Sequence, residues 1–84
     1  MATAQEVRKR ASVLTPYGTR PGAFVLSPPV ALRCEVDLDT PRGSFKKGEV
    51  VHADSLDENG KYANTVHLME RAFWWDLGIF GLSD

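Results

Sequence analysis

The segment Ala31–Asp39, ALRCEVDLD, places the strongest constraint on the fold, because apolar and charged residues alternate along it. Leu32, Cys34, Val36 and Leu38 alternate with one arginine, one glutamate and two aspartates, the last of which follows Leu38. A period of two is typical of a β-strand with one face against a core and one face in water. The segment therefore predicts a chain built on half-solvated, antiparallel β-sheet.

A second constraint comes from Asn59–Gly60, the strongest short hairpin signal in the chain. Both residues tolerate the positive φ angles of a type I′ turn. They predict a hairpin whose arms are Val50–Leu56 and Lys61–Leu68. If the turn has two residues, the pairing register places His52 opposite His67.

Several shorter segments carry turn chemistry. Thr40–Gly43 (TPRG) predicts a β-turn with Pro41 in the first central position, and Gly48 predicts a tight turn or bulge with positive φ. Phe24–Leu26 is interpreted as an edge strand that stops at Pro28–Pro29, since proline cannot donate to a ladder. Together these signals predict a mainly β fold, either a small antiparallel barrel or a meander.

The C-terminal segment has two interpretations. Val66, Met69, Phe73 and Leu77 follow helical spacing, which predicts one short helix over residues 67–77 with an extended tail after it. The aromatic content also fits strands, which would close a barrel. We favour the helix.

The first 22 residues carry no persuasive core pattern and are rich in proline and glycine towards their end. Too few apolar side chains are present to offset the entropy of ordering this segment. We expect residues 1–22 to form a flexible basic arm and residues 23–84 to form a small β-rich domain.

The net charge of −1 is not typical of a general nucleic-acid-binding protein, but the charge is unevenly distributed. Residues 1–33 hold five basic residues against one acidic residue, and residues 34–84 hold five against ten. Arg8, Lys9 and Arg10 are expected to make electrostatic contacts from the arm, with an acidic protein surface or with nucleic acid.

Length and residue content argue against an enzyme. The 84 residues make one domain, too small to enclose a substrate cavity of about 300 Å³ or more, and no residue lies in a recognisable nucleophile motif. His52 and His67 lack a spaced third ligand for zinc. Cys34 is the only cysteine, which excludes an internal disulfide and is typical of a buried small hydrophobe. We predict no catalysis, no metal and no cofactor.

Ala31–Val51 (ALRCEVDLDTPRGSFKKGEVV) resembles the opening of SH3-type small barrels. The resemblance lies in an Ala-Leu strand, a loop, the turn Ser44–Glu49 and a β-branched strand, and it implies an SH3-like barrel. Signalling SH3 domains bind proline-rich peptides in a groove lined by aromatic residues. In this chain Arg33 and Glu35 lie where aromatic residues of that groove would be expected, and no Pro-x-x-Tyr follows Phe80. The resemblance therefore implies architecture, and binding of a peptide stays an alternative function.

Half of the eight aromatic residues lie between positions 73 and 80. Trp74 and Trp75 are adjacent, so their side chains point to opposite faces of a strand or diverge by about 100° on a helix. A core this small can take one of them, and the other needs cover from Arg20–Phe24 or from another chain. We predict the second case, because such side chains are enriched at the centres of interfaces. The predicted partner-binding residues are Phe73, Trp74, Trp75, Ile79 and Phe80.

The predicted role is a non-catalytic structural or adaptor module that docks into a larger protein assembly. It would act as a homo-oligomer or as an accessory subunit of a complex or virion. The alternatives are a nucleic-acid-binding small barrel that uses the basic arm and a peptide-binding SH3-like domain. No apolar run is long enough to cross a bilayer, and none follows the basic N-terminal cluster. We expect a cytoplasmic protein that is not secreted and has no membrane or small-molecule partner.

Overall fold

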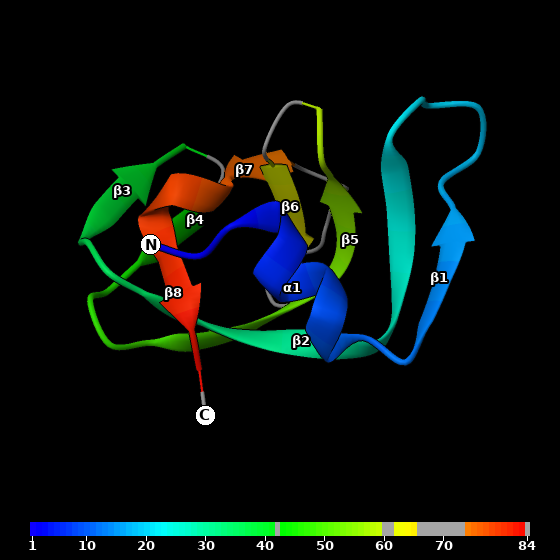
Figure 1. Cartoon of the computed structure of the whole chain (residues 1–84). Coiled ribbons are helices and arrows are strands. Elements are labelled where there is room, and N and C mark those ends of the chain that lie inside the picture. Colours follow the sequence, from blue (N-terminus) through cyan, green and yellow to red (C-terminus); the bar gives the residue numbers. More distant parts are fainter. Residues whose placement is uncertain (42, 60–61, 66–73, 84) are drawn as a thin grey trace.

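The computed structural model describes residues 1–41, 43–59, 62–65 and 74–83 (Figure 1). The fold is mainly β, with antiparallel strands and one short α-helix, which confirms the predicted fold class. The elements in chain order are α1 (Ala4–Arg10), β1 (Val13–Pro16), β2 (Ala23–Cys34), β3 (Leu38–Thr40), β4 (Gly43–Phe45), β5 (Val50–Asp57), β6 (Tyr62–Thr65), β7 (Trp74–Asp76), a 3₁₀ turn (Leu77–Ile79) and β8 (Phe80–Leu82).

β2 is the central element of the larger sheet. The hydrogen-bonded order runs β1-β2-β5-β6-β7, and β8 pairs with β2 outside this path. With 12 residues, β2 is long enough to hold β1 beside its first half and β8 beside its last three residues. β3 and β4 form a separate two-stranded sheet (Figure 1). Among the described residues, no ladder closes the larger sheet into a barrel.

The double proline interrupts β2 without ending it. Pro28 and Pro29 cannot donate backbone hydrogen bonds, and the pairing of β2 with β5 is irregular between Val25 and Val30. The prolines lie within this irregularity, where the ladder requires no donor. The expectation of a short edge strand that stops at the prolines is therefore wrong, because β2 continues to Cys34.

The alternating segment is divided between two sheets after Cys34. Leu32 and Cys34 are buried as predicted, whereas Val36 is 41% exposed and Leu38 begins β3. The Gly48 N–H donates to the Cys34 carbonyl at 2.8 Å, and the φ angle of 91° at Gly48 confirms the predicted tight turn. β2 ends at Cys34, opposite this turn. The prediction of one strand over the whole segment is wrong beyond that residue.

The β5–β6 hairpin follows the predicted register close to its turn. Asp57 pairs with Tyr62, as a two-residue turn at Asn59–Gly60 predicts. The register then shifts between Ser55 and Ala53, where β5 carries a bulge. Turn chemistry therefore sets the pairing near the loop, and the bulge changes it further along.

Residues 1–22 are folded onto the sheet and differ from the flexible arm that we expected. Thr3 is the N-cap of α1 and forms a capping box with Glu6. Val7 is fully buried, and Ala2 lies in the same core cluster. β1 then pairs with β2 along its whole length. The helix is held by Val7 in the core, by Ala4 and Ala11 packed against it and by the polar contacts of its last turn.

The C-terminal segment is strand and turn where the structure describes it. β7 pairs with β6, and the 3₁₀ turn leads directly into β8. The Asp76 carboxylate caps this turn by accepting from the Gly78 N–H at 2.8 Å. The predicted helix over residues 67–77 is therefore wrong from residue 74 onward, and residues 67–73 lie outside the described residues.

The core draws on both sheets. β4 contributes a phenylalanine to it, so the small β3–β4 sheet is anchored to the larger one through packing. The largest fully buried side chains are Phe45, Phe80, Leu26, Leu32, Leu56 and Leu77.

Candidate functional site

Trp75 belongs to the core. Its side chain is 5% exposed, and its ring meets Phe45 edge-on, with centroids 4.8 Å apart and planes at 84°. Phe45 makes a second edge contact with Phe80, at 5.5 Å between centroids. Edge-to-face contacts of this kind are favourable for aromatic rings. Trp75 and Phe80 are thus held inside the fold, which does not support their predicted role as a surface for a partner.

Trp74 lies on the opposite face of β7, as its adjacency to Trp75 predicts. The Arg20 guanidinium carbon is 4.6 Å from the centroid of the Trp74 ring, and Tyr17 meets the ring edge-on at 5.3 Å. Both residues come from the loop that joins β1 to β2. The chain's own loop therefore covers the second indole, which remains half-buried.

Asp57 at the end of β5 holds this covering loop in place. Its side chain is 6% exposed, and one carboxylate oxygen accepts from Nε and Nη2 of Arg20 at 3.0 and 2.6 Å. Beside it, Nδ2 of Asn59 donates to the Pro21 carbonyl at 3.2 Å. The loop is thus held by the ion pair between Arg20 and Asp57 of β5 and by a hydrogen bond from Asn59, just after β5, to the loop backbone.

The remaining members of the predicted partner-binding patch do not complete an exposed surface. Ile79 is half-buried in the 3₁₀ turn, and Phe73 lies outside the described residues. In the described part of the chain, Trp74 and Ile79 are the patch residues that a partner could reach. The sequence therefore located the aromatic cluster correctly but assigned too much of it to the surface.

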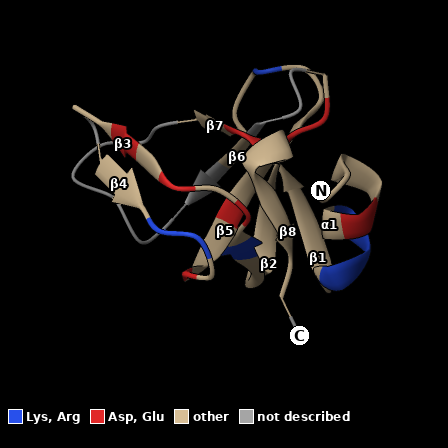
Figure 2. Cartoon of the chain, turned by 90° about the vertical axis from the view of Figure 1, so that its left-hand side faces the viewer, with Lys and Arg blue, Asp and Glu red and all other residues tan. Residues whose placement is uncertain are grey.

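The three basic residues predicted to make electrostatic contacts lie in the last turn of α1 (Figure 2). Arg8 forms an ion pair with Glu58, and Nη1 of Arg10 donates to the Ser83 carbonyl at 3.1 Å. Lys9 is exposed. Two of the three side chains therefore tie the helix to the body, and they are not carried on a free arm.

An open depression of about 300 Å³ lies beside α1. Its lining residues are Ala4, Gln5, Arg8 and Glu58, so the ion pair forms part of its wall. These residues include no nucleophile and no histidine. The depression does not support catalysis.

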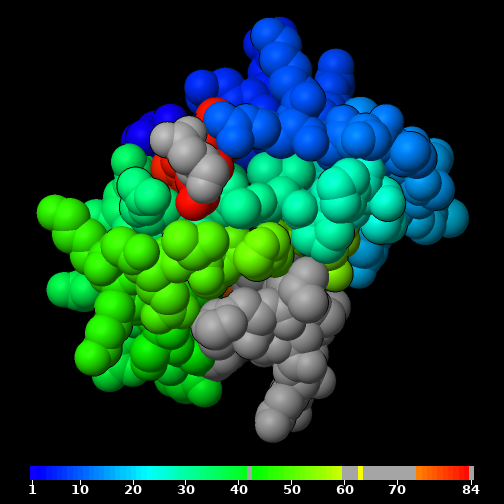
Figure 3. Space-filling model, turned by 90° about the horizontal axis from the view of Figure 1, so that it is seen from below, coloured from blue at the N-terminus to red at the C-terminus, as the bar shows by residue number. Residues whose placement is uncertain are grey.

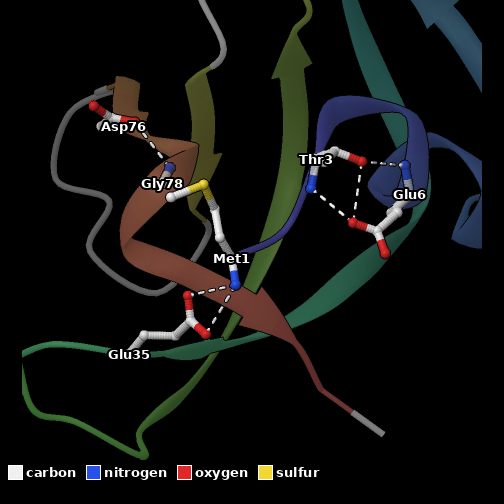
Figure 4. A network of polar contacts seen from close by, with 6 residues as sticks. All are labelled: Met1, Thr3, Glu6, Glu35, Asp76 and Gly78. Atoms are coloured by element: carbon white, nitrogen blue, oxygen red, sulfur yellow. Dashed lines mark hydrogen bonds and ion pairs between the residues drawn. The ribbon is translucent and has the colours of Figure 1, made fainter.

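The N-terminal residues occupy the outer edge of β8 (Figure 4). The Ala2 N–H donates to the Phe80 carbonyl at 2.6 Å, and the Met1 amino group lies 2.9 Å from a carboxylate oxygen of Glu35. An open strand edge is a template for pairing with another chain. Here the protein's own backbone takes that place on β8.

β1 is an open strand edge at one end of the larger sheet. All four of its residues are exposed, with Val13 at 55% and Leu14 at 37%, and Val25 of β2, which pairs with Thr15, is 38% exposed. Its only strand neighbour among the described residues is β2. The strand lies at one end of the molecule, where the space-filling view shows the light-blue N-terminal residues at the rim (Figures 1 and 3). This edge was not predicted, because residues 1–22 were expected to form an arm, although Val13–Thr15 has β-forming composition.

The titratable residues offer no catalytic or metal site within the described part of the chain. His52 is exposed and pairs with Ala31 of β2, and His67 lies outside the described residues, so their facing arrangement stays a prediction. No group of three His, Cys, Asp or Glu side chains that could hold a metal is found among the described residues. Burial, together with the charge of Glu49, raises the pKa of the Cys34 thiol to about 11. The thiol is therefore protonated and unreactive at neutral pH.

The sequence predicted that no segment of the chain crosses a bilayer. Within the described ranges, no helix has both the length and the apolar content needed to cross a bilayer.

Comparison with known proteins gives no independent assignment. The chain matches no protein-family model, no curated protein and no solved structure. The resemblance to SH3-type barrels therefore depends on Ala31–Val51, and the function has to be argued from the surfaces described above.

Proposed function

We propose that this chain is a non-catalytic structural or adaptor module that docks into a larger protein assembly through the open edge of β1. The observation that supports this proposal is the exposure of the whole strand, with apolar side chains on both faces: Val13 lies on the same face as Val25, and Leu14 lies on the opposite face. An exposed strand edge is a ready template for a strand of another chain. The other strands with one ladder partner among the described residues outside β8, namely β3, β4 and β7, have three residues each, and on β8 the Phe80 carbonyl already accepts from the Ala2 N–H.

The backbone of β1 limits how a partner strand can bind. The Tyr17 N–H donates to the Ala23 carbonyl at 2.9 Å, and hydrogen-bonded pairs alternate with non-bonded pairs along an antiparallel ladder. This alternation turns the N–H and C=O of Leu14 away from β2. Pro16 has no N–H and offers only a carbonyl. The edge therefore suits a short partner strand centred on Leu14.

The charge beside β1 indicates the chemistry of the partner. The last turn of α1, which leads into β1, carries three basic residues, and Lys9 among them is exposed (Figure 2). A second copy of the chain would bring another basic turn to the same edge, and like charges oppose such a pairing. We therefore assign the partner as a different protein chain that presents an extended apolar segment with acidic flanks.

We also propose an SH3-like architecture for the body and a cytoplasmic location. The architecture is supported by the 3₁₀ turn between β7 and β8 and by the return of β8 onto β2, the strand that contains Ala31. The location is supported by Cys34 as the single cysteine, since reduced thiols are usual in the cytoplasm.

Selection of random peptides displayed on phage against the full chain tests the docking function. We expect enriched peptides to alternate apolar residues and to carry acidic flanks. Addition of such a peptide should slow hydrogen exchange at the Leu14 N–H in an NMR experiment, because that group becomes hydrogen-bonded. Lys9→Ala should weaken binding and reduce its dependence on salt.

Two matched substitutions provide the control. Leu14→Lys places a charge at the centre of the edge, and Val36→Lys places the same charge at an exposed valine outside β1. We expect the first to abolish peptide binding and the second to leave it unchanged. Enriched peptides that bind both variants equally, or a selection that enriches no peptide, would refute the proposal.

A further inference from the structure

We infer that Tyr17, Asp57 and Trp74 form a binding site for a cationic side chain of a partner protein, either a guanidinium or an alkylammonium group. Arg20 fills this site from within the same chain. The site is built by the loop that follows β1 together with β5 and β7, and it does not depend on the docking function proposed above.

The geometry of the site is that of a cation in contact with one aromatic ring and one carboxylate. The Arg20 guanidinium carbon is 4.6 Å from the Trp74 centroid, within the range in which a cation is attracted to an aromatic face. Tyr17 meets the same indole edge-on at 5.3 Å. On the other side, Asp57 accepts from Nε and Nη2 of Arg20. Trp74 and Asp57 thus act on one cation, and Tyr17 packs against the indole that binds it.

Asp57 makes the site selective for positive charge. Its side chain is 6% exposed, so the carboxylate is largely removed from water. Departure of Arg20 would remove a positive charge from this buried carboxylate, and a neutral group cannot replace that attraction. Any group that displaces Arg20 therefore has to carry a positive charge. The paired N–H groups of a guanidinium match the present contacts best.

Arg20 is exchangeable because its side chain can leave while its loop stays in place. The side chain is 42% exposed, in contrast to that of Asp57. The loop backbone is held separately, by the bond from Asn59 to the Pro21 carbonyl and by the bond from the Glu58 N–H to the Gly22 carbonyl at 3.0 Å. A rotation of the Arg20 side chain into solvent would therefore uncover the ring and the carboxylate without opening the loop.

Arg20 consequently acts as an intramolecular competitor. A tethered group has a high effective concentration at its own site, so a partner's cation binds only when further contacts assist it. The inferred site would bind an arginine or lysine side chain of a partner protein that is also held by contacts elsewhere.

Removal of the competitor tests this inference directly. Arg20→Ala vacates the site in the full chain, and methylguanidinium chloride serves as the probe. The indole N–H resonance of Trp74 reports binding in an NMR titration and is assigned by its loss in Trp74→Phe. We expect a saturable shift, with an affinity at least about tenfold higher in Arg20→Ala than in the wild type, because the tethered side chain no longer competes.

Two controls separate a cation site from general effects. N-methylurea has a similar shape without the charge and should give no saturable shift. Arg33→Ala removes an exposed arginine of β2 outside the site and should respond like the wild type. A folded Arg20→Ala protein that gives no saturable shift, or that responds equally to N-methylurea, would overturn the inference.

A second variant covers a loss of folding. If Arg20→Ala does not fold, the titration is made on Arg20→Gln, which keeps the length of the side chain without its charge. If neither variant folds, methylguanidinium should restore the circular dichroism spectrum, and a failure to do so would also overturn the inference. Because these outcomes depend on Trp74 and not on β1, they are independent of the peptide selection at Leu14.

Discussion

The two adjacent tryptophans are covered in different ways, and the difference shows how a small chain shelters both. Trp75 is surrounded by the aromatic core, in edge contact with Phe45. Trp74, on the other face of the same strand, is covered by Arg20 and Tyr17 from a surface loop. The first contact is apolar packing, and the second combines a ring, a cation and the carboxylate of Asp57.

The two faces of β7 are therefore stabilised by different interactions. We call the face that carries Trp75 the core side and the face that carries Trp74 the loop side. On the core side, any reduction in volume leaves a cavity that the surrounding strands cannot fill. On the loop side, the cover is half-exposed and consists of polar contacts that water can partly replace. We therefore expect the core side to dominate stability and the loop side to be open to exchange.

The largest expected effect is that of removing the core indole. Trp75→Ala should lower the free energy of unfolding by about 3–5 kcal/mol, in the range for large buried aromatics. Trp74→Ala should cost about 1–2 kcal/mol, because its ring is only half-buried. Urea denaturation followed by circular dichroism measures both. Equal losses in the two variants would remove the distinction between the two faces.

High pH should weaken the core side through Cys34. Burial raises the pKa of this thiol from 9.0 to about 11, so the unfolded chain loses its proton first as the pH rises. The stabilisation is complete below pH 9 and is lost as the pH rises towards 11, by up to about 3 kcal/mol. The measurement is the free energy of unfolding against pH for the wild type and Cys34→Val. Identical slopes in the two proteins would refute the assignment to Cys34.

On the loop side, the carboxylate of Asp57 should matter more than an exposed one. Asp57→Ala removes the acceptor of two Arg20 hydrogen bonds and should cost about 1–3 kcal/mol. Asp39→Ala, at an exposed position of β3, should change stability by no more than about 0.5 kcal/mol. Thermal unfolding of the two variants makes the comparison. A cost at Asp39 that equals the cost at Asp57 would contradict the role given to burial.

The smallest expected effect is the coupling between Arg20 and Trp74. A double-mutant cycle with alanine at both positions should give a coupling energy of about 0.5–1 kcal/mol, typical of a half-exposed cation–π contact. The same cycle between Arg20 and Trp75 should give none, since Trp75 lies on the other face of the strand. Denaturant unfolding of the single and double variants supplies the values. A coupling to Trp75 as large as that to Trp74 would show that the two faces are not separate.

Local signals predicted much of the β-sheet. The turn at Asn59–Gly60 predicted the pairing of Asp57 with Tyr62, and Gly48 marked a turn with positive φ. The charge and spacing around Cys34 predicted its burial. These features depend on few neighbouring residues, so the sequence carries them directly.

Long-range contacts account for the errors. Whether β2 continued through Pro28 and Pro29 depended on a bulge against β5, which no local pattern specifies. Residues 1–22 were expected to stay unfolded because they hold few apolar residues of their own. The core that buries Val7 is made by segments far away in the sequence. The candidate docking edge at β1 was missed for the same reason.

The sequence by itself determined that Trp74 and Trp75 face opposite ways, since alternation is a property of the extended backbone. Only the tertiary structure decided what covers each ring. Arg20 lies 54 residues before Trp74 in the chain, and their contact exists because β1, β2 and β5 bring the covering loop to Asp57. Such a contact depends on packing between distant segments, which the composition of neither segment specifies.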